Sequence, residues 1–303
     1  MLSRNVGRWT LDSQSRFMEL NVDEADRILH ELWDKDVEAW ELHWVPIFRR
    51  FAHDLVTDAH VSVGHVVLDV GTGTGVAAME AVKRAKSNGI VIGIDRSAPM
   101  LELARRKCAK VKNVTFTMMN AERMTFPDEF FDVVISNCGM PYATFRETIA
   151  EIFRVLRKGG SFTFNDWHLI DVPAHRTFSE ILRRHRTEHP SQRLSSLRAA
   201  IAMMEHVGNQ YSDLKVQAEE LEHIGFANMR VRQRDYRIGL SGVREYLTLR
   251  FEREALKQEL NELSKAERAA FMKELRAGLR RFMRNGRFIM EWKVTFTHVT
   301  KPR

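Results

Sequence analysis

The sequence has few cysteines and no long apolar segment. Only Cys108 and Cys138 occur among its 303 residues. Two thiols cannot form a disulfide framework, and their scarcity favours a reducing compartment, so we expect a cytoplasmic protein. No Cys and His residues stand at the spacing of a zinc site, and no metal is expected. No stretch approaches the roughly 18 apolar residues that a membrane span needs, so a transmembrane segment is not expected.

The first residues also lack the features of a secretory signal. Residues 1–11 carry Arg4 and Arg8 but no apolar core. We therefore expect no export of the chain by this route. Internal repeats and low-complexity tracts are missing too, which argues against repeat architectures.

Positive charge is what the chain has in excess. The 47 Lys and Arg residues outnumber the 40 Asp and Glu residues, which gives a formal net charge of +7. Such a surface attracts nucleic acid, anionic lipid or an acidic small molecule. The acidic residues interspersed among the basic ones fit an ordinary solvated surface equally well. Charge alone therefore leaves nucleic acid as a possible partner without selecting it.

Short apolar runs alternate with helical patterns after residue 60. This alternation predicts a doubly wound α/β fold, a Rossmann-like sheet of seven strands with helices on both faces. Strands are predicted over 65–70, 90–95, 114–118, 131–136, 161–165, 229–238 and 288–299, and helices over 76–86, 97–108, 144–157 and 214–223.

Three helical segments stand outside this alternation. We expect residues 1–60 to form an N-terminal helical cap, and the core of residues 61–303 to carry insertions at about 170–211 and 240–286. Both insertions leave the sheet at its carboxyl edge, where ligands bind, so we expect them to form a lid. Helix stripes usually serve packing, but the apolar residues of these segments could also wall an enclosed pocket. They are Trp40, Trp44, Phe178, Met203, Met204, Tyr211, Tyr246 and Phe251.

The strongest motif is the glycine turn, residues 69–75, which follows the first strand and reads Asp-Val-Gly-Thr-Gly-Thr-Gly. Glycines let the backbone approach a ligand closely at a helix N-terminus, although many such turns are glycine-rich for steric reasons alone. Val76 stands where dinucleotide-binding turns have their third glycine. Asp95 ends the next strand, where a carboxylate can accept both ribose hydroxyls. Asp69 would repel a pyrophosphate and attract an ammonium group.

With its other motifs, the sequence resembles the class I S-adenosylmethionine-dependent methyltransferases, in the small-molecule group that includes ubiquinone and sterol methyltransferases. The resemblance covers about residues 60–168. Its motifs occur in the family's order: residues 67–75, Ile94-Asp95-Arg96-Ser97 with Met100-Leu101, Asn120-Ala121-Glu122 with residues 126–134, and residues 151–160.

The resemblance implies S-adenosyl-L-methionine as cofactor. Asn120 stands where the family commonly has Asp, so a neutral hydrogen bond would replace a charged one there. By the same resemblance, the methionine end of the cofactor would lie beside Asp69, Gly71, Thr72, Gly73 and Gly75, and its ribose beside Asp95. The adenine would lie beside Arg96 and Met100, with its amine near Asn120, Ala121 and Glu122, and Asn137 would line the cleft.

Catalysis requires an acceptor atom held in line with the sulfonium methyl, and a base only where the acceptor is weakly acidic. His168 is the first candidate for this base, with Asp166 orienting it or the substrate, and Tyr142 is a weaker candidate. His168 fits a solvent-facing loop residue equally well. Four residues separate Asn137 from Tyr142, so the Asn-Pro-Pro-Tyr motif of amino-methylating enzymes is not present.

We therefore expect methyl transfer to a small-molecule or lipid-like acceptor by in-line SN2 displacement. One alternative is an RNA or protein methyltransferase, motivated by the basic residues Arg183, Arg184, Arg186 and Arg193. Another is a catalytically silent module that only binds the cofactor. The acceptor, the methylated atom and the oligomeric state remain open at this point.

Overall fold

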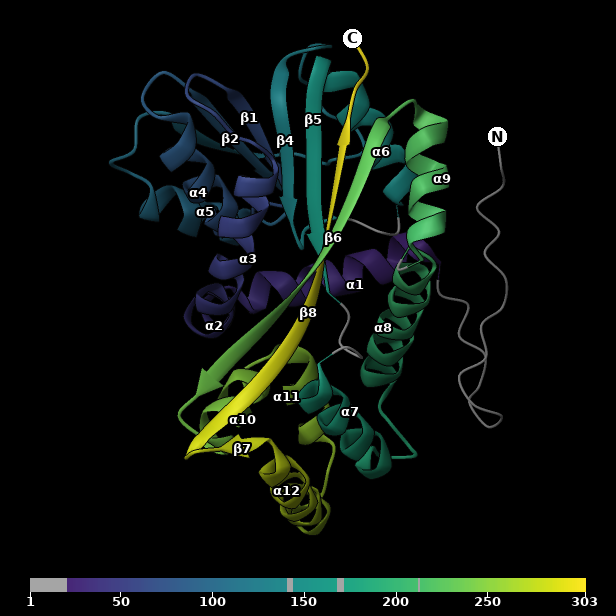
Figure 1. Cartoon of the computed structure of the whole chain (residues 1–303). Coiled ribbons are helices and arrows are strands. Elements are labelled where there is room, and N and C mark those ends of the chain that lie inside the picture. Colours follow the sequence, from purple (N-terminus) through teal and green to yellow (C-terminus); the bar gives the residue numbers. More distant parts are fainter. Residues whose placement is uncertain (1–20, 141–143, 168–171, 212) are drawn as a thin grey trace.

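The computed structural model describes residues 21–140, 144–167, 172–211 and 213–303 (Figure 1). Five parallel strands form its centre, in the order β3-β2-β1-β4-β5. Their residues are largely apolar and β-branched, as expected for strands covered on both faces. The strands are β1 (Val66–Val70), β2 (Ile90–Asp95), β3 (Val114–Met118), β4 (Phe131–Asn137) and β5 (Leu156–Asp166).

Two long antiparallel strands complete the sheet. β8 (Arg287–Thr300) pairs with β5, and β6 (Ala227–Leu240) pairs with β8 at the outer edge. The predicted seven-stranded, doubly wound α/β sheet is thereby confirmed, with a two-residue strand β7 (Met283–Arg284) added beside β8.

Helices cover both faces of the sheet. On one face, apolar residues of α3 (Val45–Asp58), α4 (Val76–Ala85) and α5 (Ala98–Lys107) share one buried cluster with β1, β2 and β3. On the other face, α6 (Phe145–Val155) and α9 (Leu214–Ile224) pack against β4 and β5. The core therefore has three layers, as the strand-helix alternation predicts.

The pair β6–β8 extends well beyond the rest of the sheet. β8 pairs with β5 only from Thr295 to Thr300, whereas its pairing with β6 continues as far as Phe288 opposite Leu240. The second insertion thus begins at the far end of a two-stranded ribbon. The inward-facing side chains of β8 along this ribbon, including Met290 and Trp292, are fully buried.

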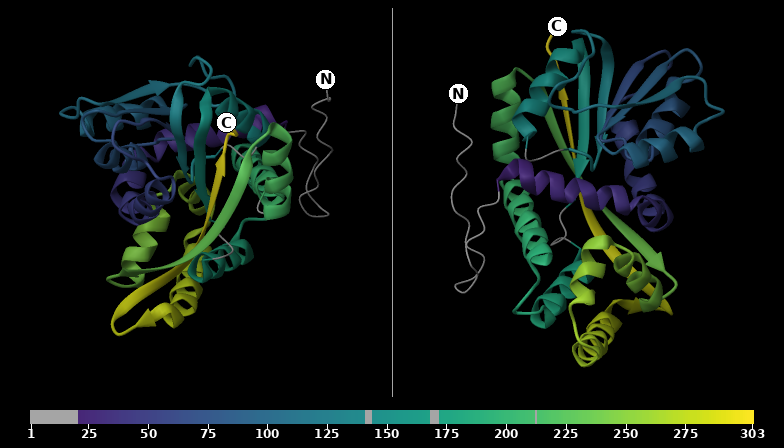
Figure 2. Two further views of the ribbon diagram at one scale, coloured as in Figure 1. Left: turned by 45° about the horizontal axis from the view of Figure 1, so that its top comes forward. Right: turned by 180° about the vertical axis from the view of Figure 1, so that it is seen from behind.

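The remaining helices lie beyond the carboxyl edge of the sheet. In Figure 1, α1 crosses the molecule below the arrowheads of β4 and β5, and a helical lobe lies below it around the ribbon; Figure 2 shows the same arrangement from behind. These elements are α1 (Val22–Lys35), α2 (Val37–Ala39), the π-helical turn η1 (Trp40–Trp44), α7 (Pro173–His185), α8 (Gln192–Gln210), α10 (Val243–Phe251), α11 (Glu254–Asn261), α12 (Lys265–Leu279) and the 3-10 turn η4 (Arg280–Phe282).

The N-terminal helices connect the two insertions to one another. Ala25 of α1 packs with Ala200 and Met203 of α8. Asp36, which follows α1, is buried and accepts a 2.6 Å hydrogen bond from Arg253 of the second insertion. The three helical segments that stand apart in the sequence therefore form one contiguous layer.

Two local predictions can be checked at helix ends. The capping box at Ser264 and Glu267 is confirmed, with hydrogen bonds of 2.8 and 3.2 Å in the two directions. The helix expected to reach Arg157 ends instead at Val155, because Leu156 already pairs with Phe131 of β4. Within the described residues, no helix is both long and apolar enough to cross a membrane.

Candidate functional site

Asp69 organises the glycine turn from the end of β1. Its Oδ2 accepts hydrogen bonds from the Thr72 hydroxyl at 2.7 Å and from the Ala78 backbone N–H at 2.9 Å. Ala78 lies in the first turn of α4, whose N-terminal N–H groups need acceptors from outside the helix. Asp69 therefore joins β1, the turn and α4, and a carboxylate is favoured at this helix end.

The other oxygen of Asp69 has no hydrogen-bond partner among the residues that the structure describes. Oδ1 is buried and accepts no hydrogen bond, and burial raises the pKa of this carboxyl to about 7, against the lowering effect of Thr72 and Ala78. The nearby charge of Asp95 raises this pKa further. A positively charged group beside Oδ1 would relieve both costs. The turn thus fits a ligand that carries an ammonium group.

The loops after β1 and β4 touch at Gly71. Its φ is +66°, and a Cβ at this position would lie 2.5 Å from the backbone oxygen of Gly139. Only glycine satisfies both requirements. The contact lies between β1 and β4, the point where the strand order reverses and where α/β sheets bind ligands.

Asp95 closes the turn from the end of β2. Its two oxygens accept hydrogen bonds from the backbone N–H of Gly73 at 2.8 Å and of Ser97 at 2.9 Å. Partial burial raises the pKa of the Asp95 carboxyl, and the hydrogen bonds from backbone N–H groups oppose this rise. Each carboxylate oxygen can accept further hydrogen bonds, so ribose hydroxyls remain compatible with this geometry.

Helix α1 lies over the segment that follows β2. The Ser97 hydroxyl donates to Asp34 at 2.5 Å, and Arg96 forms an ion pair with Asp26 at 2.5 Å. Met100, in the first turn of α5, is buried. The N-terminal cap therefore contacts the segment that carries the residues predicted to flank an adenine.

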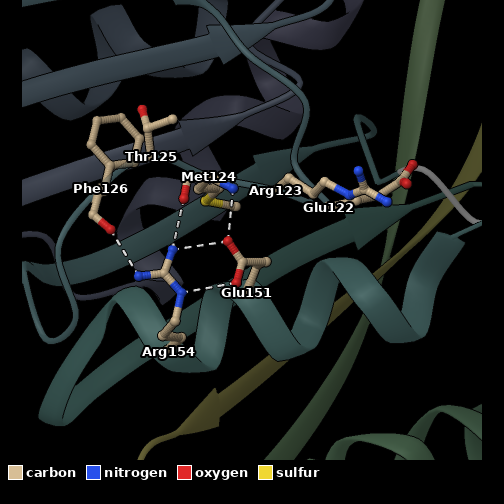
Figure 3. Close-up of a pocket in the computed structure, with 7 residues that line it drawn as sticks. All are labelled: Glu122, Arg123, Met124, Thr125, Phe126, Glu151 and Arg154. Atoms are coloured by element: carbon tan, nitrogen blue, oxygen red, sulfur yellow. Dashed lines mark hydrogen bonds and ion pairs between the residues drawn. The ribbon is translucent and has the colours of Figure 1, made fainter.

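The segment after β3 is held by α6. Asn120 Oδ1 accepts from the Glu122 backbone N–H at 3.0 Å, and Ala121 is buried in the core. A surface hollow of about 410 Å³ opens beside Glu122 (Figure 3). Arg154 donates there to the backbone oxygens of Met124 and Phe126 at 2.8 Å.

Glu151 completes that arrangement. It accepts from the Met124 backbone N–H at 2.7 Å and from Arg154, which holds the pKa of this carboxyl below its usual value (Figure 3). The hollow is thus lined by groups that already bind one another. These hydrogen bonds of Glu151 and Arg154 hold in place the segment that carries Asn120, Ala121 and Glu122.

Asn137 belongs to a hydrogen-bonded group across the ends of β4 and β5. Asn165 donates to Asn137 Oδ1 at 2.9 Å, and its own Oδ1 accepts from the Cys138 backbone N–H at 2.8 Å. The next residue, Asp166, accepts from the Trp167 backbone N–H at 2.7 Å. His168 and Tyr142 lie outside the described residues, so their roles stay predictions.

The structure adds groups that the sequence motifs do not indicate. Asn165 is buried within a strand pattern, and His175 lies in α7, fully buried, with burial lowering its pKa well below the usual value. Neither stands in a recognisable motif, and only the folded arrangement reveals them. Of the candidate pocket residues, Trp44, Phe178 and Tyr246 are buried in the apolar core.

Comparison with known proteins agrees with this geometry. Residues 62–207 match the model of a family described as a methyltransferase domain. The chain is 32% identical over 173 residues to a demethylmenaquinone methyltransferase of Symbiobacterium thermophilum, covering 53% of this chain and 64% of the relative. It is 30% identical over 142 residues to a ubiquinone/menaquinone biosynthesis C-methyltransferase of Hydrogenovibrio crunogenus, covering 46% and 54%.

A solved structure supports the fold. The phosphoethanolamine N-methyltransferase 2 of Haemonchus contortus, in complex with S-adenosyl-L-methionine, superposes with a TM-score of 0.51 at 20% identity, covering 89% of this chain and 57% of that one. The strand order and the match of residues 62–207 together identify a methyltransferase-like domain in this part of the chain. The chain spans 64% and 54% of the length of the two relatives just described.

Among the described residues, no group of three or more His, Cys, Asp or Glu side chains is arranged to hold a metal ion.

Proposed function

We propose that this protein transfers the methyl group of S-adenosylmethionine to a small-molecule or lipid-like acceptor. The observation that carries the proposal is the glycine turn, in which a buried Asp69 leaves one oxygen without a partner beside the contact between Gly71 and Gly139. An ammonium-bearing ligand complements this carboxylate, whereas a dinucleotide pyrophosphate would be repelled by it.

The cofactor supplies an electrophilic methyl group on a positively charged sulfur. Asp69 Oδ1 would bind the ammonium of its methionine end, and Asp95 would accept from its ribose hydroxyls. Between these two carboxylates, the cofactor would lie against the backbone of the turn residues Gly71, Thr72, Gly73 and Gly75. Asn137, held by Asn165, would border the same space from β4.

On the adenine side, the proposal assigns the residues next to β2 and β3. Arg96 and Met100 would flank the ring, and Asn120, Ala121 and Glu122 would lie near its amine. The ion pair of Arg96 with Asp26 connects the N-terminal cap to this side of the proposed site. Asp166 would help to position the acceptor, together with His168 and Tyr142.

A small acceptor is supported by what lies beyond the carboxyl edge. The helices α1, α7, α8 and α10 occupy this side of the sheet (Figure 1), and such a cover suits an enclosed site for a small molecule. We infer that residues 1–60, 170–211 and 240–286 act as its cap and lid. The two curated relatives carry names of quinone-modifying methyltransferases, which supports an acceptor of comparable size and apolar character.

The basic residues of the first insertion give little support to a nucleic-acid acceptor. Arg184 forms an ion pair with Glu274, and Arg186 and Arg198 both pair with the buried Glu259. Arg183 and Arg193 are exposed. Several of these charges therefore join the two insertions to one another and are not available to form a continuous surface for phosphates.

Two measurements test the function. Calorimetry should detect binding of S-adenosylhomocysteine and none of NAD; binding of NAD alone would contradict the cofactor assignment. Incubation with cofactor labelled on its methyl group and a lysate of the source cells should then place label in small molecules or lipids. Label in RNA or protein would overturn the acceptor class, and cofactor binding without any transfer would identify a silent module.

A further inference from the structure

A cluster of buried rings lies directly beyond the end of β5. We call it the aromatic cluster, and its members come from η1, from the residue after β5, from α7, from α10 and from β8. Apart from Trp167, which is partly buried, each is at most 2% exposed. Cys138, the residue after β4, packs against the same apolar group. The members are Trp44, Trp167, His175, Tyr246 and Trp292.

Within the described residues, three nitrogens of this cluster are buried without a hydrogen-bond partner. They are Nε1 of Trp44, Nε2 of His175 and Nε1 of Trp292. The three ring centres lie 5.2 to 6.3 Å from one another. Buried polar groups almost always have a partner, and each exception needs its own explanation. Three exceptions in adjoining rings point to a ligand that supplies the missing hydrogen bonds.

The hydrogen bonds of Tyr246 determine which nitrogen of His175 carries the proton. The Tyr246 hydroxyl lies 3.0 Å from the Ala174 backbone oxygen and 2.9 Å from His175 Nδ1. A carbonyl oxygen can only accept, so the single hydroxyl proton points at Ala174. His175 Nδ1 must therefore donate to the hydroxyl oxygen, and a neutral ring keeps its lone pair on Nε2.

The surroundings keep the His175 ring neutral. Burial lowers its pKa well below the usual value, and the charge of Arg250 lowers it further. Arg250 lies 4.6 Å above the ring of Phe178, and its buried Nε has no hydrogen-bond partner within the part of the chain that the structure describes. An anion bound in the cluster would thus meet a neutral base and a nearby cation.

The three unpartnered nitrogens together indicate which chemical group of a ligand could bind them. Nε2 of His175 needs a proton donor, and the two indole N–H groups need an acceptor. A hydroxyl is both, and rings on several sides favour a flat, apolar molecule around it. We propose that the aromatic cluster binds the methyl acceptor, a flat conjugated molecule with an acidic hydroxyl, with His175 Nε2 as the proton acceptor.

This assignment rests on the proposed function, and it accounts for the proton and the electron pairs in the transfer of the methyl group. The acceptor O–H bond breaks, its proton passes to His175 Nε2, and both electrons of the bond stay on the acceptor. The acceptor anion then forms a bond to the methyl carbon, while the sulfur–methyl bond breaks with its electron pair left on sulfur. Trp44 and Trp292 hold the acceptor oxygen, and His175 later releases the proton to water.

A matched pair of probes tests the site without knowledge of the natural acceptor. 4-Nitrophenol carries the hydroxyl, and 4-nitroanisole is the same ring with a methyl ether. Binding of each to protein loaded with S-adenosylhomocysteine is followed by quenching of tryptophan fluorescence. We expect the wild type to prefer the phenol about tenfold or more, the scale of losing hydrogen bonds to buried groups. Equal binding of the two probes overturns the proposal.

Two substitutions separate the roles of the His175 nitrogens. In His175→Asn the amide can still donate to Tyr246 but nothing replaces Nε2, so the preference for the phenol should fall below about threefold. In His175→Gln the amide oxygen can occupy the place of Nε2, so part of the preference should return. Retention of the full preference in His175→Asn would contradict the assignment.

A measurement on the unaltered protein covers the case in which the variants fail to fold. The ¹⁵N signal of His175 Nε2 should shift on addition of 4-nitrophenol and stay in place with 4-nitroanisole. Calorimetry with S-adenosylhomocysteine separates the two levels of the proposal. If that ligand fails to bind, the proposed function fails; if it binds normally while neither probe does, only the aromatic cluster is wrongly assigned.

Discussion

The glycine turn and the aromatic cluster differ in how they are assembled. The turn and its carboxylates come from one strand-helix-strand unit, between Asp69 at the end of β1 and Asp95 at the end of β2. The aromatic cluster joins residues as distant in sequence as Trp44 and Trp292. Among the buried side-chain atoms of the described residues, the turn has one without a hydrogen-bond partner, Asp69 Oδ1, whereas the cluster has three.

This difference separates two tasks. A local unit with its own hydrogen bonds can keep one geometry in many proteins, which suits a cofactor common to all of them. A cluster assembled from distant segments changes with each insertion, which suits an acceptor that differs between proteins. Substitutions in the two regions should therefore alter different measurements, and the following predictions run from the largest expected effect to the smallest.

Gly71→Ala should damage the turn most. The substitution places a side chain at a φ of +66° and within 2.5 Å of the Gly139 oxygen, so we expect the free energy of unfolding to fall by about 3–5 kcal/mol. Gly73→Ala is the matched control, because φ is +51° there and no atom lies within 4 Å; a loss of about 1–2 kcal/mol is expected. Urea unfolding measures both, and equal losses would show that the contact with Gly139 does not matter.

Asp69→Asn should change how stability depends on pH. The pKa of Asp69 is raised to about 7 in the folded protein, so between about pH 4 and 7 the folded state binds more protons than the unfolded state. Its contribution to stability is full below the unfolded pKa and is lost as pH rises through about 7.

The wild type should therefore lose about 2–4 kcal/mol from this group between pH 4 and pH 8, and Asp69→Asn should lack this component. Urea unfolding at several pH values measures the difference between the two proteins. A difference that stays constant over this range would show that Asp69 is ionised throughout. Because an ammonium group favours the charged carboxylate, S-adenosylhomocysteine should reduce the pH dependence of the wild type.

Asp95→Ala should weaken binding of S-adenosylhomocysteine by about 1.5–3 kcal/mol, the scale of hydrogen bonds to a charged acceptor. The structure adds a second effect, because Asp95 also accepts from Gly73 and Ser97, so a moderate fall in melting temperature should accompany the loss. Calorimetry and thermal melting distinguish the two effects. Unchanged binding with a collapsed melting temperature would make Asp95 a purely structural residue.

Tyr246→Phe should have the smallest effect, about 0.5–2 kcal/mol of stability, because it removes a buried hydroxyl but keeps the ring. Binding of S-adenosylhomocysteine should not change, since Tyr246 belongs to the aromatic cluster alone. Preference for 4-nitrophenol over its methyl ether should decrease, because the proton of His175 is then no longer held on Nδ1. Tyr236→Phe, which removes a hydroxyl bonded to Asp54, is the control and should leave that preference intact.

Much of the cofactor half follows from sequence because its determinants are local. The seven strands, the glycine turn and Asp95 are all encoded by apolar runs, glycines and an acidic residue within short windows. Helix ends agree where the capping chemistry is local, as at Ser264 and Glu267. The end of α6 lies two residues before the predicted one, because pairing of Leu156 with β4 is a tertiary interaction that the local pattern does not contain.

The aromatic cluster shows what sequence alone does not determine. The helical pattern predicts that Trp44 and Tyr246 are apolar helix residues, but nothing in it predicts that both adjoin His175. That meeting depends on how far the ribbon β6–β8 extends beyond β5, since the ribbon carries Trp292 to the cluster. Short-range periodicity and backbone freedom specify the sheet and the glycine turn, so both can be predicted from the sequence. The rings that meet in the aromatic cluster cannot be predicted in this way, because tertiary packing joins segments that no local pattern links.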